Sequence, residues 1–324
     1  METQTEILKS LVEVDGAEIF VLVLLPQLPA FGVEKPLEIE ICGRSMIKWI
    51  DEVVAGYEHK KVDVKKSDDI MTIVRENASE HKYTVVVYAD TPLLTKASIE
   101  QAVAFAASFE HKVCKMPRGC VFTDIKSADE NLEAVEIPNL IPEDFIVAYN
   151  YPQLALIATH ARMRINTKHL RHGVNLVDPH NAYIDADVVI GKGTRVGPGV
   201  VIRGESKIGK NCRLTNFVEI KNSNIGDGVK IAHMSYIGDA EVGDGCNIGC
   251  GVVFCNYNGK VKEKITLGSG VFVGSNSNLV APLTVGENAY IAAGSTITQE
   301  VPKNALGIAR ARQAIKEDWN SVND

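Results

Sequence analysis

Residues 188 to 220 read VVIGKG TRVGPG VVIRGE SKIGKN CRLTNF VEI when the chain is written in groups of six. The third letter of each group is Ile, Val or Leu, and this spacing continues on both sides with two five-residue steps and one break. A period of six fits neither an amphipathic helix nor an alternating strand, so it indicates a chain that turns a corner every six residues. The full series of anchors is Ile184, Ile190, Val196, Ile202, Ile208, Leu214, Ile220, Ile225, Ile231, Ile237, Val242, Ile248, Phe254, Leu267, Val273, Leu279, Val285, Ile291 and Ile297.

Two further positions of the repeat carry a pattern. The residue after the anchor is often glycine, which we interpret as a tight corner with unusual backbone angles; these are Gly191, Gly197, Gly209, Gly226, Gly238, Gly243, Gly249, Gly268, Gly274 and Gly286. The residue four past the anchor is usually small or β-branched, and we expect it to share a narrow interior with the anchors. Three hexapeptides close a coil of about 18 residues, so the segment predicts roughly six coils stacked at the ~4.8 Å strand spacing.

Length, composition and charge limit the number of domains and the kinds of partner that we expect. A chain of 324 residues is long enough for two domains. The net charge of −7 and the lack of a basic cluster in the sequence argue against a nucleic-acid partner. The longest apolar run, Ile19 to Leu25, is too short to span a membrane, and no signal segment opens the chain. We therefore expect a cytoplasmic protein without membrane insertion.

The seven cysteines do not have the spacing of a disulfide framework. Cys246, Cys250 and Cys255 are close enough in sequence to suggest a metal cluster. However, Cys246 falls on an inward position of a coil and Cys250 two residues past an anchor, so we interpret all seven as free cytosolic thiols.

The first 150 residues have the pattern of an α/β domain. Strands are expected at Ile19 to Leu25 and Thr84 to Tyr88, and helices at Ser45 to Ala55 and Ser98 to Phe109. Asp90 follows the carboxyl end of the second strand, a position where α/β domains place ligand or metal contacts, although a turn residue before Pro92 is an equally good interpretation. A helix from Tyr151 to His172 follows, and Gly173 ends it.

Six segments together resemble a known enzyme family. They are residues 164–179, RINTKHLRHGVNLVDP; 216–221, NFVEIK; 233–243, HMSYIGDAEVG; 255–259, CNYNG; 279–286, LVAPLTVG; and 308–312, IARAR. They are similar to the carboxyl-terminal half of the bifunctional N-acetylglucosamine-1-phosphate uridylyltransferase/glucosamine-1-phosphate N-acetyltransferase family. The match covers roughly residues 150 to 319.

The resemblance implies a fold, a domain order and an oligomer. It predicts a truncated, Rossmann-like nucleotidyltransferase domain at residues 1–150, a linker helix at 151–173 and a left-handed parallel β-helix of hexapeptide repeats at 174–324. It also predicts a homotrimer and acetyl-coenzyme A as a substrate. The implied reaction is N-acetylation of glucosamine 1-phosphate in UDP-N-acetylglucosamine biosynthesis.

Arg203 and Lys221 are 18 residues apart, or one coil, and each follows an anchor. They should therefore be stacked on one corner, about 5 Å apart. Two cations this close repel each other unless an anion lies between them, and a phosphate would fit, although two solvated surface cations are the plainer interpretation. In the family that the chain resembles, the corresponding positions bind the sugar phosphate.

The resemblance also assigns the other acceptor and catalytic residues. His233 matches the general base, a role for which an imidazole titrating near neutral pH is suited. Glu219 matches a residue that orients or polarises the site. Tyr236 and Asn247 match sugar contacts, and Lys262 lies on the loop that reaches a neighbouring subunit in the family.

For acetyl-coenzyme A, the matched positions lie along the coils beyond His233. The backbone N–H of Cys250 would polarise the thioester carbonyl, although the family commonly has Ala there. Arg310 is suited to a coenzyme phosphate. The other matched positions are Asn256, Tyr257, Ser275 and Ala293.

The amino-terminal domain departs from the family. A uridylyltransferase of this kind has a glycine-rich phosphate loop after its first strand, and here that position reads LLPQLPAFG, residues 24–32. Pro26 and Pro29 lack the backbone N–H that such a loop needs. Asp90 matches the magnesium position, so Mg²⁺ is implied only if the domain is active. We expect a degenerate, inactive domain; the alternatives are a bifunctional enzyme with residual uridylyltransferase activity and a non-enzymatic sugar-nucleotide binding module.

Overall fold

The computed structural model describes the chain except for residues 1–10, 110, 124, 126–132, 318 and 320–324. The chain divides into two units, Met1–Ala161 and Arg162–Asp324. No helix among the described residues is both long and apolar enough to cross a membrane.

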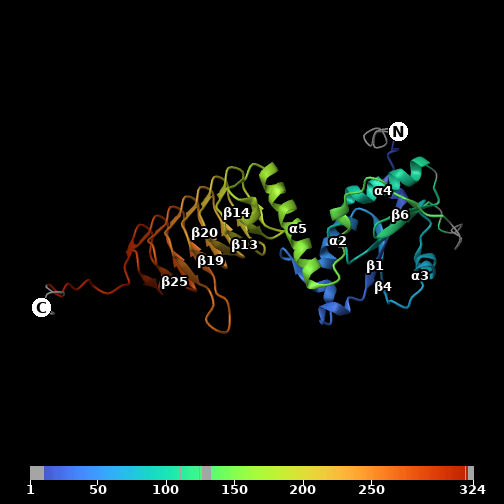
Figure 1. Ribbon diagram of the computed structural model, residues 1–324. Coiled ribbons are helices and arrows are strands. Elements are labelled where there is room, and N and C mark those ends of the chain that lie inside the picture. The colour runs from blue at the N-terminus through green and yellow to red at the C-terminus, as the bar shows by residue number, and fades with distance from the viewer. Residues whose placement is uncertain (1–10, 110, 124, 126–132, 318, 320–324) are drawn as a thin grey trace. The chain divides into compact units, whose positions relative to one another are not determined.

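Six strands form one mixed sheet in the first unit, in the order β4-β1-β5-β7-β6-β8 (Figure 1). β1, β4 and β5 are parallel, whereas β7 is antiparallel to both β5 and β6. The carboxyl ends of β1, β4 and β5 therefore meet at one edge of the sheet. The strands are β1 Ile19–Pro26, β4 Glu58–Val64, β5 Tyr83–Tyr88, β6 Val113–Met116, β7 Gly119–Phe122 and β8 Val135–Glu136.

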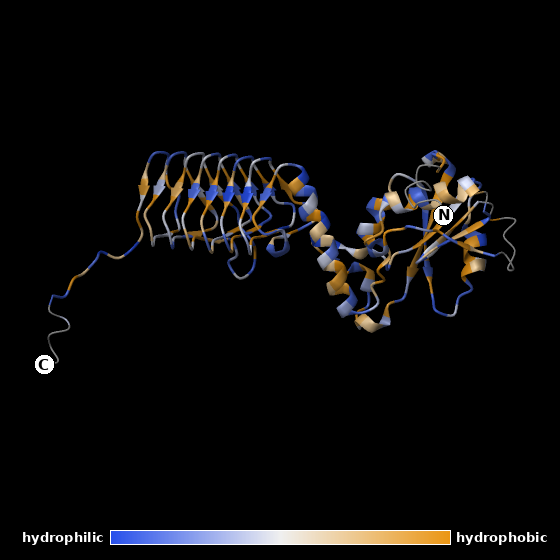
Figure 2. Ribbon diagram, turned by 45° about the horizontal axis from the view of Figure 1, so that its top comes forward, coloured by the Kyte–Doolittle hydropathy of each residue, from blue (hydrophilic) through white to orange (hydrophobic). Residues whose placement is uncertain are grey.

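Helices pack on both faces of this sheet, because successive strand residues point to opposite sides. Val21 and Val85 pack with residues of α2 Met46–Val54 and α4 Lys96–Phe109, whereas Leu22 and Val86 pack with Val74 of α3 Ile70–Asn77. The predicted α/β fold is confirmed, as are its two strands and two helices, although α4 begins two residues before the predicted Ser98. Figure 2 shows the hydrophobic strands between the helices.

Short elements complete this unit. The strands β2 Glu40–Ile41 and β3 Arg44–Ser45 form an antiparallel pair, and Ser45 caps α2 by accepting a hydrogen bond from the Lys48 N–H. Three-residue 3₁₀ turns, η1 Gly16–Glu18, η2 Pro29–Phe31 and η3 Pro36–Glu38, and the four-residue η5 Pro142–Phe145 connect the larger elements.

The long helix α5 Tyr151–Arg171 contributes to both units. In the first unit its Ile157 and Ala161 join a buried cluster with Phe31 and Met46. In the second, Asn166 Nδ2 donates to the carbonyls of Pro179 (2.7 Å) and Ala182 (2.9 Å), which attaches the helix to η6 Pro179–Asn181 and the start of the coils. As predicted, the helix ends just before Gly173, whose φ is +84°.

The second unit is a solenoid of three parallel sheets (Figure 1). The first face has the strand order β10-β13-β16-β19-β22-β25-β28, the second face β11-β14-β17-β20-β23-β26, and the third face β29-β27-β24-β21-β18-β15-β12-β9. The chain enters each first-face strand from the third face, at what we call the entry corner, and leaves it toward the second face at the exit corner.

The strands of the solenoid are two or three residues long. They are β9 Asn175–Leu176, β10 Tyr183–Ile184, β11 Val189–Ile190, β12 Arg195–Val196, β13 Val201–Arg203, β14 Lys207–Ile208, β15 Arg213–Leu214, β16 Glu219–Lys221, β17 Asn224–Ile225, β18 Lys230–Ile231, β19 Tyr236–Gly238, β20 Ala240–Val242, β21 Asn247–Ile248, β22 Val253–Cys255, β23 Ile265–Leu267, β24 Phe272–Val273, β25 Asn278–Val280, β26 Leu283–Val285, β27 Tyr290–Ile291, β28 Thr296–Ile297 and β29 Leu306–Gly307.

Anchors and small residues fill the solenoid interior, as the repeat predicts. All nineteen anchors are buried. The small or β-branched residues four past an anchor are buried as well: Val188, Thr194, Val200, Ser206, Val218, Val229, Val252, Ser277, Ala289 and Ser295. The coils also extend beyond the predicted anchors: β9 pairs with β12 before Ile184, and β29 pairs with β27 after Ile297.

The interpretation of the glycine after the anchor is wrong. None of these glycines has a positive φ; in the coils most glycines that do lie two positions later, as at Gly193, Gly228 and Gly245. The glycine after the anchor is required because the next coil is too close for a side chain: a Cβ on Gly191 would lie 2.6 Å from the carbonyl carbon of Gly209, and one on Gly243 would lie 2.5 Å from Ser269 N.

His169 gives a test of α5 packing. Its imidazole is 7% exposed, and burial, together with the charges of Lys168 and His172, lowers its pKa from 6.5 to about 4. The unfolded chain therefore binds a proton below about pH 6.5 that the folded chain does not, so stability falls as the pH drops from 6.5 to 4, by up to about 3 kcal/mol. We expect His169→Gln to flatten this dependence in melting curves followed by circular dichroism at pH 7 and pH 5. The exposed-site control His180→Gln should retain it, and equal pH dependence in His169→Gln and the wild type would contradict the assignment.

Candidate functional site

Arg203 and Lys221 are stacked on the first face of the solenoid. β13 and β16 pair in register, with Val201 opposite Glu219 and Arg203 opposite Lys221. Anchors Ile202 and Ile220 are fully buried, so the residues on either side of them point outward. The predicted stacking of the two cations at one corner is confirmed, and this corner is the exit corner.

Glu219 lies beside Arg203. Its Oε1 is 3.7 Å from Arg203 Nε, with both side chains about half exposed. In the next coil Tyr236 pairs with Glu219, and Gly238 pairs with Lys221. The first face therefore carries Arg203, Glu219, Lys221 and Tyr236 on three consecutive strands.

Tyr236 belongs to a hydrogen-bond network with two residues of the exit corner. Asn256 Nδ2 donates to Asp239 Oδ2 (2.5 Å) and lies 3.5 Å from Tyr236 Oη. Because a carboxylate only accepts hydrogen bonds, Asp239 fixes the Asn256 amide with its nitrogen toward the network and its Oδ1 away from it. A side chain on Gly238 would collide with Tyr236 Oη and Asn256 Nδ2, so glycine is needed beneath this contact.

Burial raises the pKa of the Tyr236 phenol, and the charges of Asp239 and Glu219 raise it further against the opposing effects of Asn256 and Arg203. The phenol therefore keeps its proton at neutral pH and remains a hydrogen-bond donor.

The break in the repeat is an outward loop at the exit corner. Residues 256–264 leave after β22 and return before β23, and Figure 1 shows this loop projecting from the coils. Tyr257 and Lys262 form an antiparallel bridge, and Tyr257 Oη donates to the Gly259 carbonyl (2.7 Å). Lys264 Nζ lies 2.9 Å from Glu241 Oε1 at the base of the loop.

His233 lies at the entry corner of the same first-face strand, β19, whose exit end adjoins Lys221. Its side chain is exposed. His233 and the two cations therefore border the same face of the solenoid, at its opposite edges.

In the coils that follow His233 in the sequence, the residues at the entry corner form a regular column. The Gly251 N–H donates to the His233 carbonyl (2.9 Å), the Asn276 N–H to Cys250 (2.8 Å) and the Gly294 N–H to Ser275 (2.9 Å). His233, Cys250, Ser275 and Ala293 thus occupy one corner in four successive coils. Arg310 lies at the end of this column, with its Cδ 4.0 Å from where a Cβ on Gly294 would be. Within the described chain, the Cys250 N–H has no hydrogen-bond acceptor.

The structure does not bring every predicted residue to the first face. Asn247 pairs with Lys230 and Phe272 on the third face, around the entry corner from Tyr236. Tyr257 and Lys262 lie on the outward loop, and among the described residues neither side chain forms a hydrogen bond or ion pair with a first-face side chain. In one chain the predicted site is therefore divided among two faces and a loop.

The three neighbouring cysteines also lie apart. Cys246 Sγ is in the interior, 3.1 Å from the Gly268 carbonyl, while Cys250 is at the entry corner and Cys255 on the first face. No group of three His, Cys, Asp or Glu side chains in the described ranges could hold a metal ion.

Asp90 in the first unit is placed as predicted, after the carboxyl end of β5, but its carboxylate has a partner. Arg118 Nε donates to Oδ1 (3.2 Å) and Nη2 to Oδ2 (2.7 Å), and the Asp90 side chain is 2% exposed. Mg²⁺ needs several oxygen ligands in octahedral geometry. Both Asp90 oxygens face a guanidinium instead, so the residues do not fit the ion.

The edge of the sheet beside β1 holds a cavity of about 650 Å³. Its lining includes Leu25 and Pro26 at the end of β1, Gln27 and Pro29 after it, and Lys65 after β4. Two of these four β1-side residues are prolines, which supply no backbone N–H to a phosphate.

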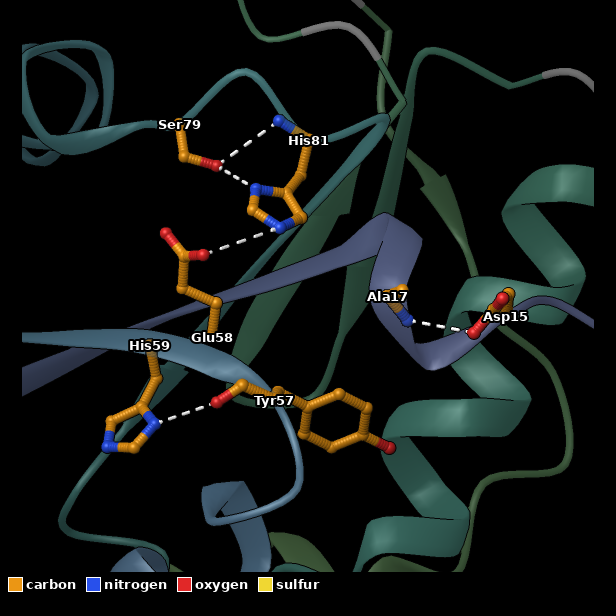
Figure 3. A network of polar contacts seen from close by, with 7 residues as sticks. All are labelled: Asp15, Ala17, Tyr57, Glu58, His59, Ser79 and His81. Atoms are coloured by element: carbon orange, nitrogen blue, oxygen red, sulfur yellow. Dashed lines mark hydrogen bonds and ion pairs between the residues drawn. The ribbon is translucent and has the colours of Figure 1, made fainter.

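A Ser-His-Glu group occurs elsewhere in this unit (Figure 3). Ser79 Oγ lies 2.5 Å from His81 Nδ1, and His81 Nε2 lies 3.8 Å from Glu58 Oε2. A catalytic triad needs a buried carboxylate that orients the imidazole. The Glu58 side chain is 66% exposed and its contact is long, so we assign the group to fixing the turn before β5.

Three residues of these sites were not predicted from the sequence: Gly238, Asp239 and Arg118. Asp239 and Asn256 are 17 residues apart, one short coil, so register could have paired them. Arg118 has no such signal, because the hairpin that carries it has no repeat.

The solenoid defines the second unit as a left-handed β-helix of hexapeptide repeats. The family model "Bacterial transferase hexapeptide (six repeats)" matches residues 187–222 and 264–299.

Curated relatives carry the name bifunctional protein GlmU. The Brevibacillus brevis protein is 41% identical over 229 residues, 55% of this chain and 50% of the relative; the Clostridium tetani protein is 43% identical over 223 residues, 53% and 49%. The resemblance to the bifunctional family is thus confirmed, and the chain spans about half of the length of these relatives.

Solved structures are less similar. The AntD N-acyltransferase from Bacillus cereus is 18% identical with a TM-score of 0.32, covering 45% of this chain and 90% of that one. The GDP-perosamine N-acetyl transferase from Caulobacter crescentus is 15% identical with a TM-score of 0.27, covering 89% and 93%. With TM-scores this low, we draw no conclusion from these structures.

The Tyr236 network can be tested by titration. We expect the Tyr236 phenol, followed by NMR of ring-labelled tyrosine, to titrate above the ordinary pKa of about 10. Asp239→Asn should lower this pKa because it removes a neighbouring negative charge, and Asn tolerates the local φ of +50°. Glu241→Gln on the second face is the control. A Tyr236 pKa at or below 10, or one unchanged in Asp239→Asn, would show that the network is not formed.

Proposed function

We propose that the second unit transfers the acetyl group of acetyl-coenzyme A to the amine of glucosamine 1-phosphate, giving N-acetylglucosamine 1-phosphate. The observation that carries this proposal is the arrangement of the first face. Two stacked cations border one edge and an exposed imidazole the other, so a phosphorylated amino sugar lying across the face would meet both.

The phosphate would bind Arg203 and Lys221. Two unit charges about 5 Å apart repel by about 1 kcal/mol even in water, and a phosphate dianion between them turns this repulsion into attraction. The guanidinium supplies a planar pair of donors and the ammonium a compact charge. Glu219, 3.7 Å from Arg203, would hold the guanidinium in this orientation.

The sugar would lie over Tyr236, with His233 as general base. The amine nitrogen attacks the thioester carbonyl and forms the C–N bond while His233 takes a proton from that nitrogen. The tetrahedral intermediate then breaks its C–S bond, and the leaving thiolate takes the proton from His233. Tyr236, protonated at neutral pH, would donate to a sugar oxygen.

Acetyl-coenzyme A would lie along the entry corner. The unpaired N–H of Cys250 is one coil from His233, which suits it to stabilise the negative charge that develops on the thioester oxygen. Ser275 and Ala293 would line the coenzyme farther along the column, and Arg310 would contact one of its phosphates.

A homotrimer would complete the site. Asn247 on the third face and Tyr257 and Lys262 on the loop are separated from Tyr236 within one chain, so they would act on the first face of a neighbouring copy. Asn256, held by Asp239 at the base of that loop, would connect the loop to the sugar site.

The base can be tested directly. Coenzyme A released from acetyl-coenzyme A in the presence of glucosamine 1-phosphate should be measured by chromatography, because the protein's own thiols interfere with thiol reagents. We expect turnover by the wild type, a loss of about a hundredfold or more in His233→Ala, and little change in the control His180→Ala. Wild-type turnover that persists in His233→Ala would reject this base.

The phosphate contact predicts a substrate-specific defect. Arg203→Ala and Lys221→Ala should each raise the KM for glucosamine 1-phosphate about tenfold or more, as expected for loss of a charge-assisted hydrogen bond. Turnover with glucosamine, which has no phosphate to bind these cations, should not change. Arg213→Ala on the third face is the matched control, and an equal loss with both acceptors would count against phosphate binding.

A further inference from the structure

The carboxyl edge of the first unit's sheet contains an ion pair with bidentate geometry, in which the Asp90 carboxylate is buried and the Arg118 side chain is 34% exposed. Asp90 follows β5, and Arg118 comes from the turn between β6 and β7. Nε and Nη2 of the guanidinium each donate to a different oxygen of the carboxylate, at 3.2 Å and 2.7 Å. A planar guanidinium matches a carboxylate in this way, and both oxygens are used.

The turn that carries Arg118 is fixed against β5. Gly119 has a φ of +121°, and a side chain there would collide with the Val86 carbonyl. β7 pairs with β5 in register, with Cys120 opposite Val86. The Arg118 Cζ also lies 3.9 Å from the centre of the Tyr88 ring. The guanidinium is thus held by backbone, ring and carboxylate together.

The positive charge of Arg118 neutralises the Asp90 carboxylate, as a bound metal ion would. Burial raises the pKa of Asp90, while hydrogen bonds and charge from Arg118 lower it. A divalent cation would have to displace the guanidinium, and a buried carboxylate that loses its charged partner is destabilised. Among the described residues, Asp90 belongs to no group of three or more His, Cys, Asp or Glu side chains that could hold a metal ion.

We propose that Arg118 replaces a divalent cation at this edge, so that the first unit carries its own fixed positive charge and binds no metal at Asp90. Any ligand that reaches this edge meets a guanidinium directly. This inference is independent of the acetyl transfer proposed for the second unit, because it concerns binding of an ion by the first.

The test is Mn²⁺ binding by the full chain, measured by electron paramagnetic resonance of the free ion. We expect wild type and Asp90→Asn to bind the same number of Mn²⁺ ions. Asp63→Asn, which removes an exposed carboxylate at the carboxyl end of β4, controls for surface binding. Loss of one equivalent of Mn²⁺ in Asp90→Asn but not in Asp63→Asn would overturn the proposal.

A second measurement avoids dependence on a variant that fails to fold. The melting temperature of the wild type should be the same in EDTA and in millimolar Mg²⁺ or Mn²⁺, because an ion that bound the native first unit would raise it. Arg118→Gln should melt at a lower temperature than the wild type in EDTA, whereas Lys115→Gln on the same hairpin should not. A manganese peak beside Asp90 in anomalous diffraction from wild-type crystals would also overturn the proposal.

Discussion

Parallel pairing in register at the strand spacing is the constraint on which the second unit depends. In the central coils each strand residue has its partner 17 or 18 residues later, beside it in the next coil, except across the outward loop; the spacing is 20 between β9 and β12 and 16 between β27 and β29. A single side-chain choice is therefore repeated along a column. Hydrophobic columns close the interior, and a polar column at a corner becomes a row of contacts along which an extended ligand could lie.

The same constraint explains why the glycines after the anchors are needed. Adjacent coils approach so closely at these positions that a side chain would touch the backbone of the next coil, as at Gly191 and Gly243. The positive-φ positions, which we expected here, lie two residues later. Periodicity identified the corners but could not separate close approach from backbone conformation, because both requirements select glycine.

The solenoid and its corner columns could be predicted from the sequence because they depend on spacing alone. Arg203 and Lys221 were paired in this way. The residues of the entry-corner column were instead assigned through the resemblance, and the register of the coils then explains why they lie in one column. Asn247 shows the limit: its distance from an anchor did not reveal that it lies on a different face from Tyr236. The contact of Arg118 with Asp90 could not be predicted. It depends on the pairing of the β6–β7 hairpin with β5, and a long-range pairing of this kind leaves no periodic signal in the sequence.

The central claim is that the stacked cations of the first face hold a phosphate while the amine faces His233. A crystal structure of the protein with glucosamine 1-phosphate tests it most directly. The account predicts phosphate oxygens within about 3 Å of both the Arg203 guanidinium and Lys221 Nζ, the distance of charge-assisted hydrogen bonds, with the sugar over Tyr236. A sugar phosphate bound elsewhere, with Arg203 and Lys221 both left in solvent, would contradict it.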